Sequence, residues 1–172
     1  MIIYLGADHR GFALKEELKA FLFDRGYDVV DMGNEVEEEG DDYPDFAAAV
    51  ADAVSNNPVE DRGIVICGSG VGVDIVANKF IDIRSALISN SDQAKAARND
   101  DDANVLALAA DFLDADTAKA IVDAFIETAY DGAEHHQRRI DKITELELGP
   151  IVGESAEEAE DAPENEEKEN TT

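Results

Sequence analysis

Five short runs of β-branched and apolar residues alternate along this chain with longer segments of helical period. The runs are residues 2–5, 27–31, 63–66, 85–89 and 104–107. Between the first two, Leu14, Leu18 and Leu22 share one helical face. A run such as GIVIC is apolar throughout, which is typical of strands buried on both faces of a parallel sheet. The alternation therefore predicts an α/β fold, a Rossmann-like three-layer α/β/α sandwich with a five-stranded parallel sheet.

Helix boundaries follow from the residues that flank each segment. Gly26 ends the first helix, and Pro44 opens a second that stops before Asn56. Further helices are expected from the glycine loop to about Phe80, over 92–98, from Asp114 or Asp116 to Ala129, and over 134–148. The last of these carries apolar side chains that are available to pack on a second subunit.

The acidic balance of the chain excludes several classes of partner. Its 172 residues contain 41 Asp and Glu against 14 Lys and Arg, a formal net charge of −27. Such a charge disfavours binding to nucleic acid or to an anionic membrane surface. Nine acidic residues and one lysine fall in 151–172, which has almost no large apolar residue after Val152. We expect one domain over residues 1–149 and a disordered acidic tail over 150–172.

Location and redox chemistry are constrained by what the sequence lacks. No segment reaches the roughly 18 to 20 apolar residues of a membrane span, and the first residues do not resemble a signal peptide. Cys67 is the only cysteine, so an internal disulfide framework is excluded, and no spacing of His, Cys and Asp resembles a zinc site. The sequence predicts a cytoplasmic protein without a metal.

Polar residues gather where the predicted strands meet loops. Asp8 and His9 follow the first strand, the third strand leads into Cys67-Gly68-Ser69-Gly70-Val71-Gly72, and residues 98–103 precede the fifth strand. Ligands of open α/β sheets bind at the carboxyl ends of the strands. We therefore expect these three segments to converge on one cleft.

The glycine loop is the most informative of these segments. Its glycines let backbone N–H groups turn toward an anion, and the same groups would favour the thiolate form of Cys67, making it a base or nucleophile. The alternative is that Cys67 is a small apolar filler at the end of a buried strand. No Lys-Ser/Thr pair follows the glycines, and they do not follow the first strand, so the loop is neither a P-loop nor a dinucleotide fingerprint.

The histidines and the arginines near residue 138 also allow a structural or a functional interpretation. His9 is either a structural histidine or, beside Asp8 at a strand end, part of the site. His135 and His136, with Arg138 and Arg139, either pair with nearby acids at a solvated helix start or form an anion site. Their positive charge in a very acidic chain favours the anion site.

Six segments together resemble the ribose-5-phosphate isomerase B type of sugar-phosphate isomerases, a family that includes the galactose-6-phosphate isomerase subunits. They are GADHRGFALK, DYPDFA, GIVICGSGVGVDIVANKF, IRSAL, ANVLAL and HHQRRIDKI, which begin at residues 6, 42, 63, 83, 103 and 135. In order and spacing the resemblance covers about residues 1–148, and the block around Cys67 is its most specific part.

The resemblance implies a cofactor-free interconversion of an aldose and a ketose through a cis-enediolate, most simply of ribose 5-phosphate and ribulose 5-phosphate. It assigns the base to Cys67, proton movement between the sugar oxygens to Ser69, and contact with the sugar near its ring oxygen to Asp8. It further implies that the enediolate is held by Gly68, Gly70, Val71 and Gly72. Tyr43 would form a wall of the pocket, and the phosphate would be bound by His9, His136 and Arg139. Members form dimers or tetramers whose active sites combine two chains, so a homodimer or homotetramer is expected.

The sequence departs from the family at the sugar and phosphate positions. Asp100 and Asp101 stand where the family reads His-Asn, and that histidine serves sugar ring opening. Asp111 stands where most members have an arginine for the phosphate, and His135 occupies a second arginine position. Two cations are lost and three anions gained, which weakens the attraction for a phosphate dianion. The alternatives are an isomerase of a different or unphosphorylated sugar, or a noncatalytic sugar-binding paralogue.

Overall fold

The structure, a computed structural model, describes residues 1–149, so the predicted tail over 150–172 lies outside the described residues. Strands and helices alternate through the body of the chain, and a sixth helix follows. The elements are β1 (Ile2–Ala7), α1 (Phe12–Asp24), β2 (Asp28–Asp31), α2 (Tyr43–Ser55), β3 (Arg62–Cys67), α3 (Val71–Ala77), β4 (Ser85–Leu87), α4 (Ser91–Asp101), β5 (Val105–Ala109), α5 (Ala115–Glu127) and α6 (Glu134–Leu148).

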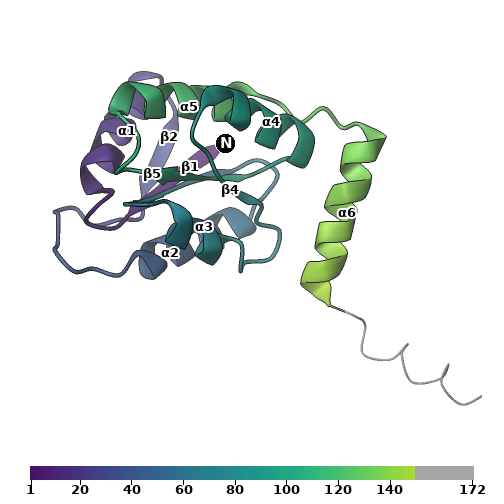
Figure 1. The fold of residues 1–172 in the computed structure, drawn as a ribbon, viewed down its shortest axis with the longest axis horizontal. Helices are drawn as coiled ribbons and strands as arrows, with labels where there is room; N and C mark the ends of the chain where they lie inside the picture. Colours follow the sequence, from purple (N-terminus) through teal and green to yellow (C-terminus); the bar gives the residue numbers. More distant parts are fainter. Residues whose placement is uncertain (150–172) are drawn as a thin grey trace, which may run out of the picture.

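All five strands are parallel, in the order β2-β1-β3-β5-β4. Helices α1, α4 and α5 cover one face of the sheet, and α2 and α3 cover the other (Figure 1). This arrangement confirms the predicted three-layer sandwich. Alternate residues of β3 enter different cores: Ile64 and Ile66 pack with α1 and α5, whereas Val65 and Cys67 pack with α2 and α3.

Two helices differ from their predicted bounds near the site. Helix α3 ends at Ala77 rather than about Phe80, because the Asn78 side chain binds the backbone N and O of Ser85, at 2.9 and 3.0 Å. Helix α4 runs to Asp101 rather than Arg98, and ends where Asp102 adopts a left-handed conformation with φ of 46°. Residues 99–101 are thus helical instead of forming a loop.

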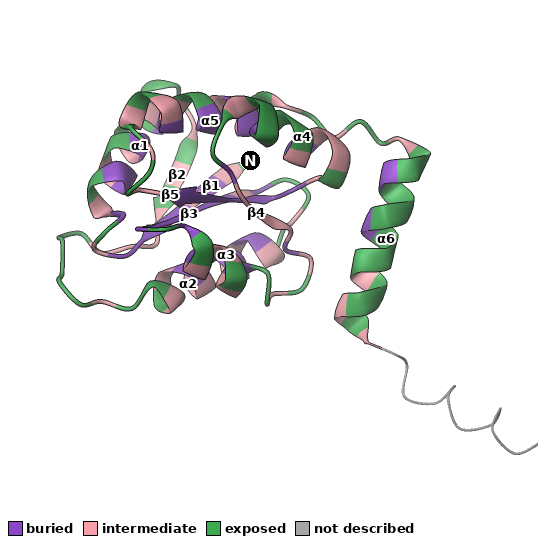
Figure 2. Ribbon diagram, in the orientation of Figure 1, coloured by how far each residue is buried: buried purple, intermediate pink, exposed green. Residues whose placement is uncertain are grey.

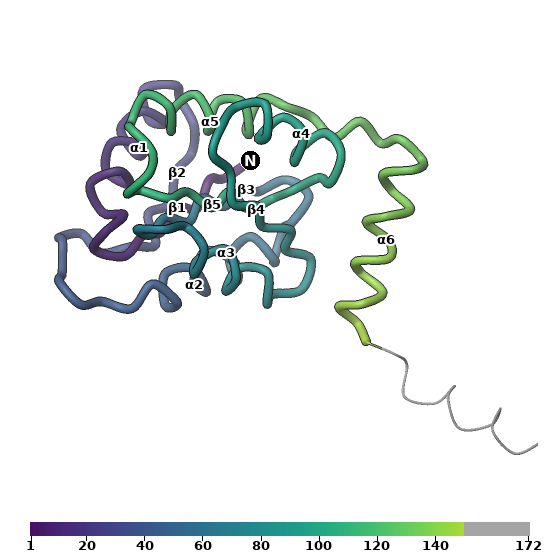
Figure 3. Tube along the Cα trace, in the orientation of Figure 1, coloured from purple at the N-terminus to yellow at the C-terminus, as the bar shows by residue number. Residues whose placement is uncertain are grey.

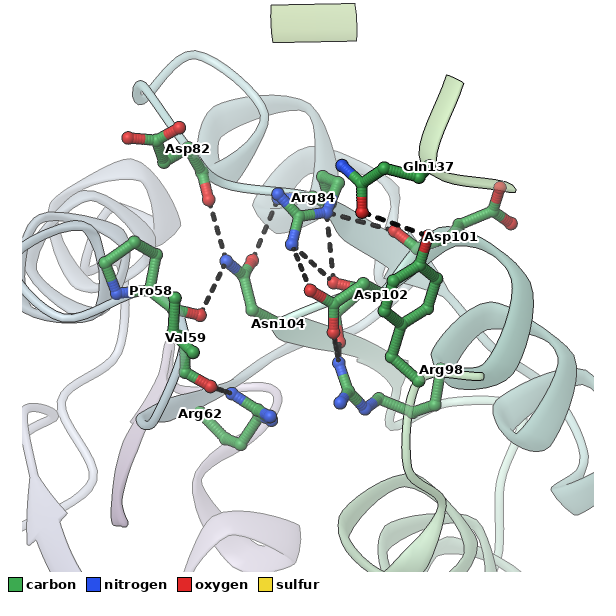
Figure 4. Close-up of polar contacts among 12 residues, drawn as sticks. Pro58, Val59, Arg62, Asp82, Arg84, Arg98, Asp101, Asp102, Asn104 and Gln137 are labelled. Carbon is green, nitrogen blue, oxygen red and sulfur yellow. Dashed lines mark hydrogen bonds and ion pairs between the residues drawn. The ribbon is translucent and has the colours of Figure 1, made fainter. Parts of the chain in front are cut away.

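The connection from α4 to β5 is fixed by a buried polar network (Figure 4). Asn104 is fully buried; its amide donates to the carbonyl of Asp82 at 2.7 Å, and its Oδ1 accepts from the N–H of Arg84. The Arg84 guanidinium donates to the carbonyls of Asp101 and Asp102 and pairs with the Asp102 carboxylate at 2.8 Å. This network anchors the start of β5 at the amino edge of the sheet.

Helix α6 stands away from the sandwich, beyond α4 (Figure 1). Most of its surface is exposed, and its buried residues are His136 and Ile140 (Figure 2). The trace also shows the long connection from β2 to α2 running out from the sheet before it returns (Figure 3). Within residues 1–149, no helix combines the length and apolar character needed to cross a membrane.

Candidate active site

A cavity of about 350 Å³ opens at the carboxyl edge of the sheet, beside the ends of β1 and β3. Its walls combine reactive side chains with the glycine loop. The lining residues are Asp8, Arg10, Tyr43, Cys67, Gly68, Ser69, Val71, Gly72 and Ile75. Seven of these nine are residues that the sequence placed in the site, and we call the cavity the thiol pocket.

Cys67 is the last residue of β3 and is buried, with 4% of its surface exposed. Its side chain faces the α2 and α3 layer because Val65, two residues earlier, does so. The Sγ atom accepts a hydrogen bond from the N–H of Gly70 at 3.2 Å. Gly70 has a φ of 72°, the left-handed conformation that glycine adopts without strain, and this turn aims its N–H back at the sulfur. The contact stabilises negative charge on Cys67.

Two further glycines leave room for side chains that form the walls of the thiol pocket. A Cβ at Gly72 would lie 2.5 Å from the Tyr43 ring, and a Cβ at Gly68 would lie 2.5 Å from the Arg10 guanidinium. Bulkier residues would therefore displace both side chains. The glycines serve the pocket in two ways: they free the backbone to face a ligand, and they let Tyr43 and Arg10 approach the loop.

Asp8 and His9 leave β1 together but take different partners. The Asp8 carboxylate is buried and accepts from the N–H of Gly11 at 3.0 Å. His9 turns to Asp41, whose Oδ1 accepts from the His9 backbone at 2.8 Å and lies 2.7 Å from Nδ1. The amide of Asn34 donates to the other oxygen of Asp41 at 3.1 Å. The acidic segment 35–45 thus supplies a carboxylate that orients His9.

Replacing Asp41 with asparagine is expected to lower the pKa of His9. In the wild type, the hydrogen bond that the His9 ring donates to Asp41 raises this pKa above its usual value of about 6.5, with Asp8 adding a weaker effect in the same direction. Because the folded-state pKa is raised, the linked stability is complete below about pH 6.5 and is lost as pH rises through the folded-state pKa. The measurement is the pH titration of the His9 ring protons by NMR, assigned with a His9→Gln variant.

Glu39→Gln is the matched control, since it removes an exposed carboxylate from the same loop. It should leave the His9 titration close to that of the wild type. Identical titrations in the wild type and Asp41→Asn would contradict the assigned role of Asp41.

The remaining predicted residues form a second group at the other end of the molecule. Asp100 lies in the last turn of α4, and His136 lies in the first turn of α6. Nε2 of His136 is 3.7 Å from Asp100, and its Nδ1 is 3.0 Å from Asp131. Asp131 also accepts from the backbone of Ala133, and this bond, with His136 second, lowers the pKa of Asp131.

His135 and Arg139 belong to the same helix end. The rings of His135 and His136 have centroids 4.0 Å apart, and both residues sit with Arg139 in the first two turns of α6. Asp101 is the last residue of α4 and lines a different, apolar groove. The ligand atoms of Asp100, Asp131 and His136 lie within 4.8 Å of one another, so the absence of a metal here stays a prediction.

The expected convergence of all three segments within one chain is wrong. Asp8 and Cys67 lie at the carboxyl ends of β1 and β3, but Asp100 precedes β5 and so lies at the amino edge. Strands that run parallel start at one edge of a sheet and end at the other. The predicted site residues are therefore divided between the thiol pocket and the end of α6.

Two of the three acids that depart from the family lie beside a basic side chain. The Asp111 carboxylate pairs with the Arg10 guanidinium. Asp100 lies 3.7 Å from Nε2 of His136. The count of gained anions alone therefore overstates the uncompensated negative charge.

Sequence reasoning missed Arg10 and Asp41. Arg10 lies within GADHRG, but its pairing with Asp111 spans 101 positions and no periodic pattern encodes it. Asp41 lies 32 positions from His9 in a run of acids that resembles a solvated surface. The usable signal was the adjacency of each to a predicted site residue: Arg10 follows His9, and Asp41 stands two residues before Tyr43.

Comparisons with known proteins identify the family of this chain. The family model described as Ribose/Galactose Isomerase matches residues 3–143. Ribose-5-phosphate isomerase B of Escherichia coli is 44% identical over 145 residues, 84% of this chain and 95% of that protein. A Mycoplasma genitalium ribose-5-phosphate isomerase B structure with bound ribulose-5-phosphate has a TM-score of 0.84 and 42% identity, and covers 87% of this chain and 97% of its own. A Clostridium thermocellum homologue gives 0.82 and 44%, covering 86% and 98%. The chain therefore belongs to the ribose/galactose isomerase family.

Proposed function

We propose that this protein interconverts ribose 5-phosphate and ribulose 5-phosphate through a cis-enediolate, with Cys67 as the base. The observation that carries the proposal is the Cys67 sulfur, held by the Gly70 N–H in a cavity that Asp8 and Ser69 also line. Family membership and a relative whose structure holds ribulose-5-phosphate support the choice of substrate.

The chemistry follows from where these groups stand. The Cys67 thiolate takes the C2 proton of the aldose and returns it to C1, while a hydroxyl proton moves between O1 and O2 with the help of Ser69. The backbone N–H groups of Gly68, Gly70, Val71 and Gly72 stabilise the negative charge of the enediolate. Electrons move only within the sugar, so the reaction needs no redox cofactor.

Substrate binding is assigned to groups around this centre. Asp8 contacts the sugar near its ring oxygen, and Tyr43 forms one wall of the thiol pocket. His9 faces the phosphate end, together with His135, His136 and Arg139. Asp100 takes the place of the ring-opening histidine, and Asp101 stands beside it in α4.

The active site is proposed to combine two chains of a homodimer or homotetramer. Cys67 and His136 lie at different ends of the folded molecule. A second copy therefore has to bring its α6 to the thiol pocket. An apolar groove of about 450 Å³ between α6 and the sandwich, lined by Ile83, Ile143 and Leu146 among others, supports such an interface. Leu146 is 83% exposed in the single chain, so its side chain is available to pack against a second copy.

A cytoplasmic location is part of the same proposal. The single cysteine suits a reducing compartment, because a reactive thiol has to stay reduced to act as a base. The proposed substrate, a sugar phosphate, is also that of metabolic relatives whose sequences match most of this chain.

A panel of sugars tests the substrate. We expect ribose 5-phosphate to be isomerised with exchange of its C2 proton, followed by NMR in deuterated water, and we expect kcat/KM for unphosphorylated ribose to be at least about 100-fold lower, since charge-assisted bonds to the phosphate are lost. Galactose 6-phosphate reports on chain length. Turnover that does not depend on the phosphate would favour the alternative substrate, and calorimetric binding without any proton exchange would favour the noncatalytic alternative.

A further inference from the structure

Arg10 has no role in the proposed isomerisation chemistry. It follows β1, lines the thiol pocket, and directs its guanidinium across the carboxyl edge to the Asp111 carboxylate beyond β5. Because β1, β3 and β5 are neighbours in the sheet, the loops after these three strands adjoin. The Arg10 side chain spans them, passing over the loop that carries Cys67.

The glycine loop is shaped to admit this side chain. A Cβ at Gly68 would lie 2.5 Å from both Cζ and Nε of Arg10, so any other residue at this position would push the guanidinium away. The N–H of Asp111 donates to the carbonyl of Gly68 at 3.0 Å, which ties the partner carboxylate to the same loop. Arg10, Gly68 and Asp111 therefore fix one another at the rim of the pocket.

The charges of the side chains that line the pocket indicate what Arg10 can bind. Among the described residues that line it, Arg10 is the one cationic side chain, and Asp8 is an anion. Asp111 accepts from a single guanidinium nitrogen, Nη2, and the Arg10 side chain is 56% exposed. The remaining N–H groups form a planar fork of the kind that binds phosphate oxygens in pairs.

We propose that Arg10 binds the phosphate of the substrate at the rim of the thiol pocket, with Asp111 holding its guanidinium in place. The proposal rests on the proposed function for the identity of the substrate. Arg10 and Asp111 neutralise each other when no phosphate is bound. The phosphate dianion then binds the guanidinium N–H groups that Asp111 does not use, so it does not displace Asp111. A cation beside the pocket also offsets the acidic background of a chain with a net charge of −27.

Arg10→Gln tests the proposal with two readouts. The KM for ribose 5-phosphate is expected to rise on the order of 10- to 100-fold with kcat changed less than about threefold, because the lost bonds go to a nonreacting group. The affinity for inorganic phosphate, measured by calorimetry without turnover, should fall by a similar factor. Arg10→Lys, which keeps the charge but loses the fork, should give an intermediate loss in both.

Arg25→Gln is the matched control. Arg25 is a partly exposed arginine whose guanidinium pairs with Asp123 at 2.6 Å, on the surface between α1 and α5, and its loss should change neither KM nor phosphate affinity. The double variant Arg10→Asp with Asp111→Arg should bind phosphate at least about tenfold better than Arg10→Asp alone, since the guanidinium returns to the same rim from the other side.

Three results would overturn the proposal. They are an unchanged KM and phosphate affinity in Arg10→Gln, a fall in kcat with KM unchanged, which would move Arg10 to the reacting end, and no recovery in the double variant. If the wild type fails to turn over ribose 5-phosphate, the proposed function fails, and the phosphate titration of the same variants still tests Arg10.

Discussion

Cys67→Ala is expected to lower isomerisation by about 10³-fold, the typical contribution of a positioned base, and to slow exchange of the C2 proton by a similar factor. The thiol is buried against the glycine loop, and Asp8 supplies the one carboxylate among the described side chains that line the thiol pocket. The NMR exchange assay gives the rate directly. Activity that survives the substitution would contradict the role of Cys67.

Loss of packing has to be separated from loss of chemistry. Val65→Ala truncates a fully buried side chain on the same face of β3, two residues before Cys67, without touching the thiol. It should lower the free energy of unfolding by about 1 to 3 kcal/mol, more than Cys67→Ala does, and keep most of the activity. The opposite order of effects would assign Cys67 to the core rather than to the reaction.

Mixed oligomers extend this experiment to the composite site. Cys67→Ala and His136→Ala chains should each be inactive alone, but a mixed dimer restores one complete site when the two residues come from different chains. Coexpression in equal amounts should therefore recover about a quarter of the wild-type activity, since about half of the dimers are mixed and each has one working site. A site built within one chain would show no recovery.

The layers of this fold were predictable from the sequence because they depend on local patterns. Unbroken apolar runs identified β1, β3 and β5, and a period of 3.6 identified the helices between them. The prediction of α6 over 134–148 matches Glu134–Leu148. Helix ends were less predictable. Helix α4 continues through Asp100 and Asp101 to a C-cap at Asp102, whose pairs with Arg84 and Arg98 no local pattern encodes.

The content of the thiol pocket was predictable, whereas the pairs around it were not. Cys67 and the glycine loop are contiguous in sequence, so one motif places them together. The contacts of His9 with Asp41 and of Arg10 with Asp111 join loops that only the folded sheet brings side by side. The misplaced Asp100 segment had a different cause, because a segment that precedes a parallel strand has to lie at the amino edge, a constraint already present in the element order.

Gly70→Ala is expected to cost about 2 to 4 kcal/mol of unfolding free energy and on the order of 100-fold in kcat/KM. At a φ of 72° an alanine is strained, and its Cβ would collide with the Leu87 side chain and lie 3.0 Å from the carbonyl oxygen of Leu108. Relief requires the loop to move, which takes the Gly70 N–H away from the Cys67 sulfur that it now meets at 3.2 Å. Urea unfolding at fixed protein concentration and steady-state kinetics measure the two losses.

Gly132→Ala separates backbone strain from the geometry of the loop. Gly132 also has a positive φ, of 65°, but an added Cβ would meet no atom of the described residues within 4 Å. Its substitution should cost about 1 kcal/mol, the strain of a left-handed alanine, and leave kcat/KM near the wild-type value. Equal losses from the two glycines would mean that left-handed strain alone explains Gly70. A larger loss at Gly70, with kcat falling more than KM rises, ties that glycine to the charge that develops beside Cys67.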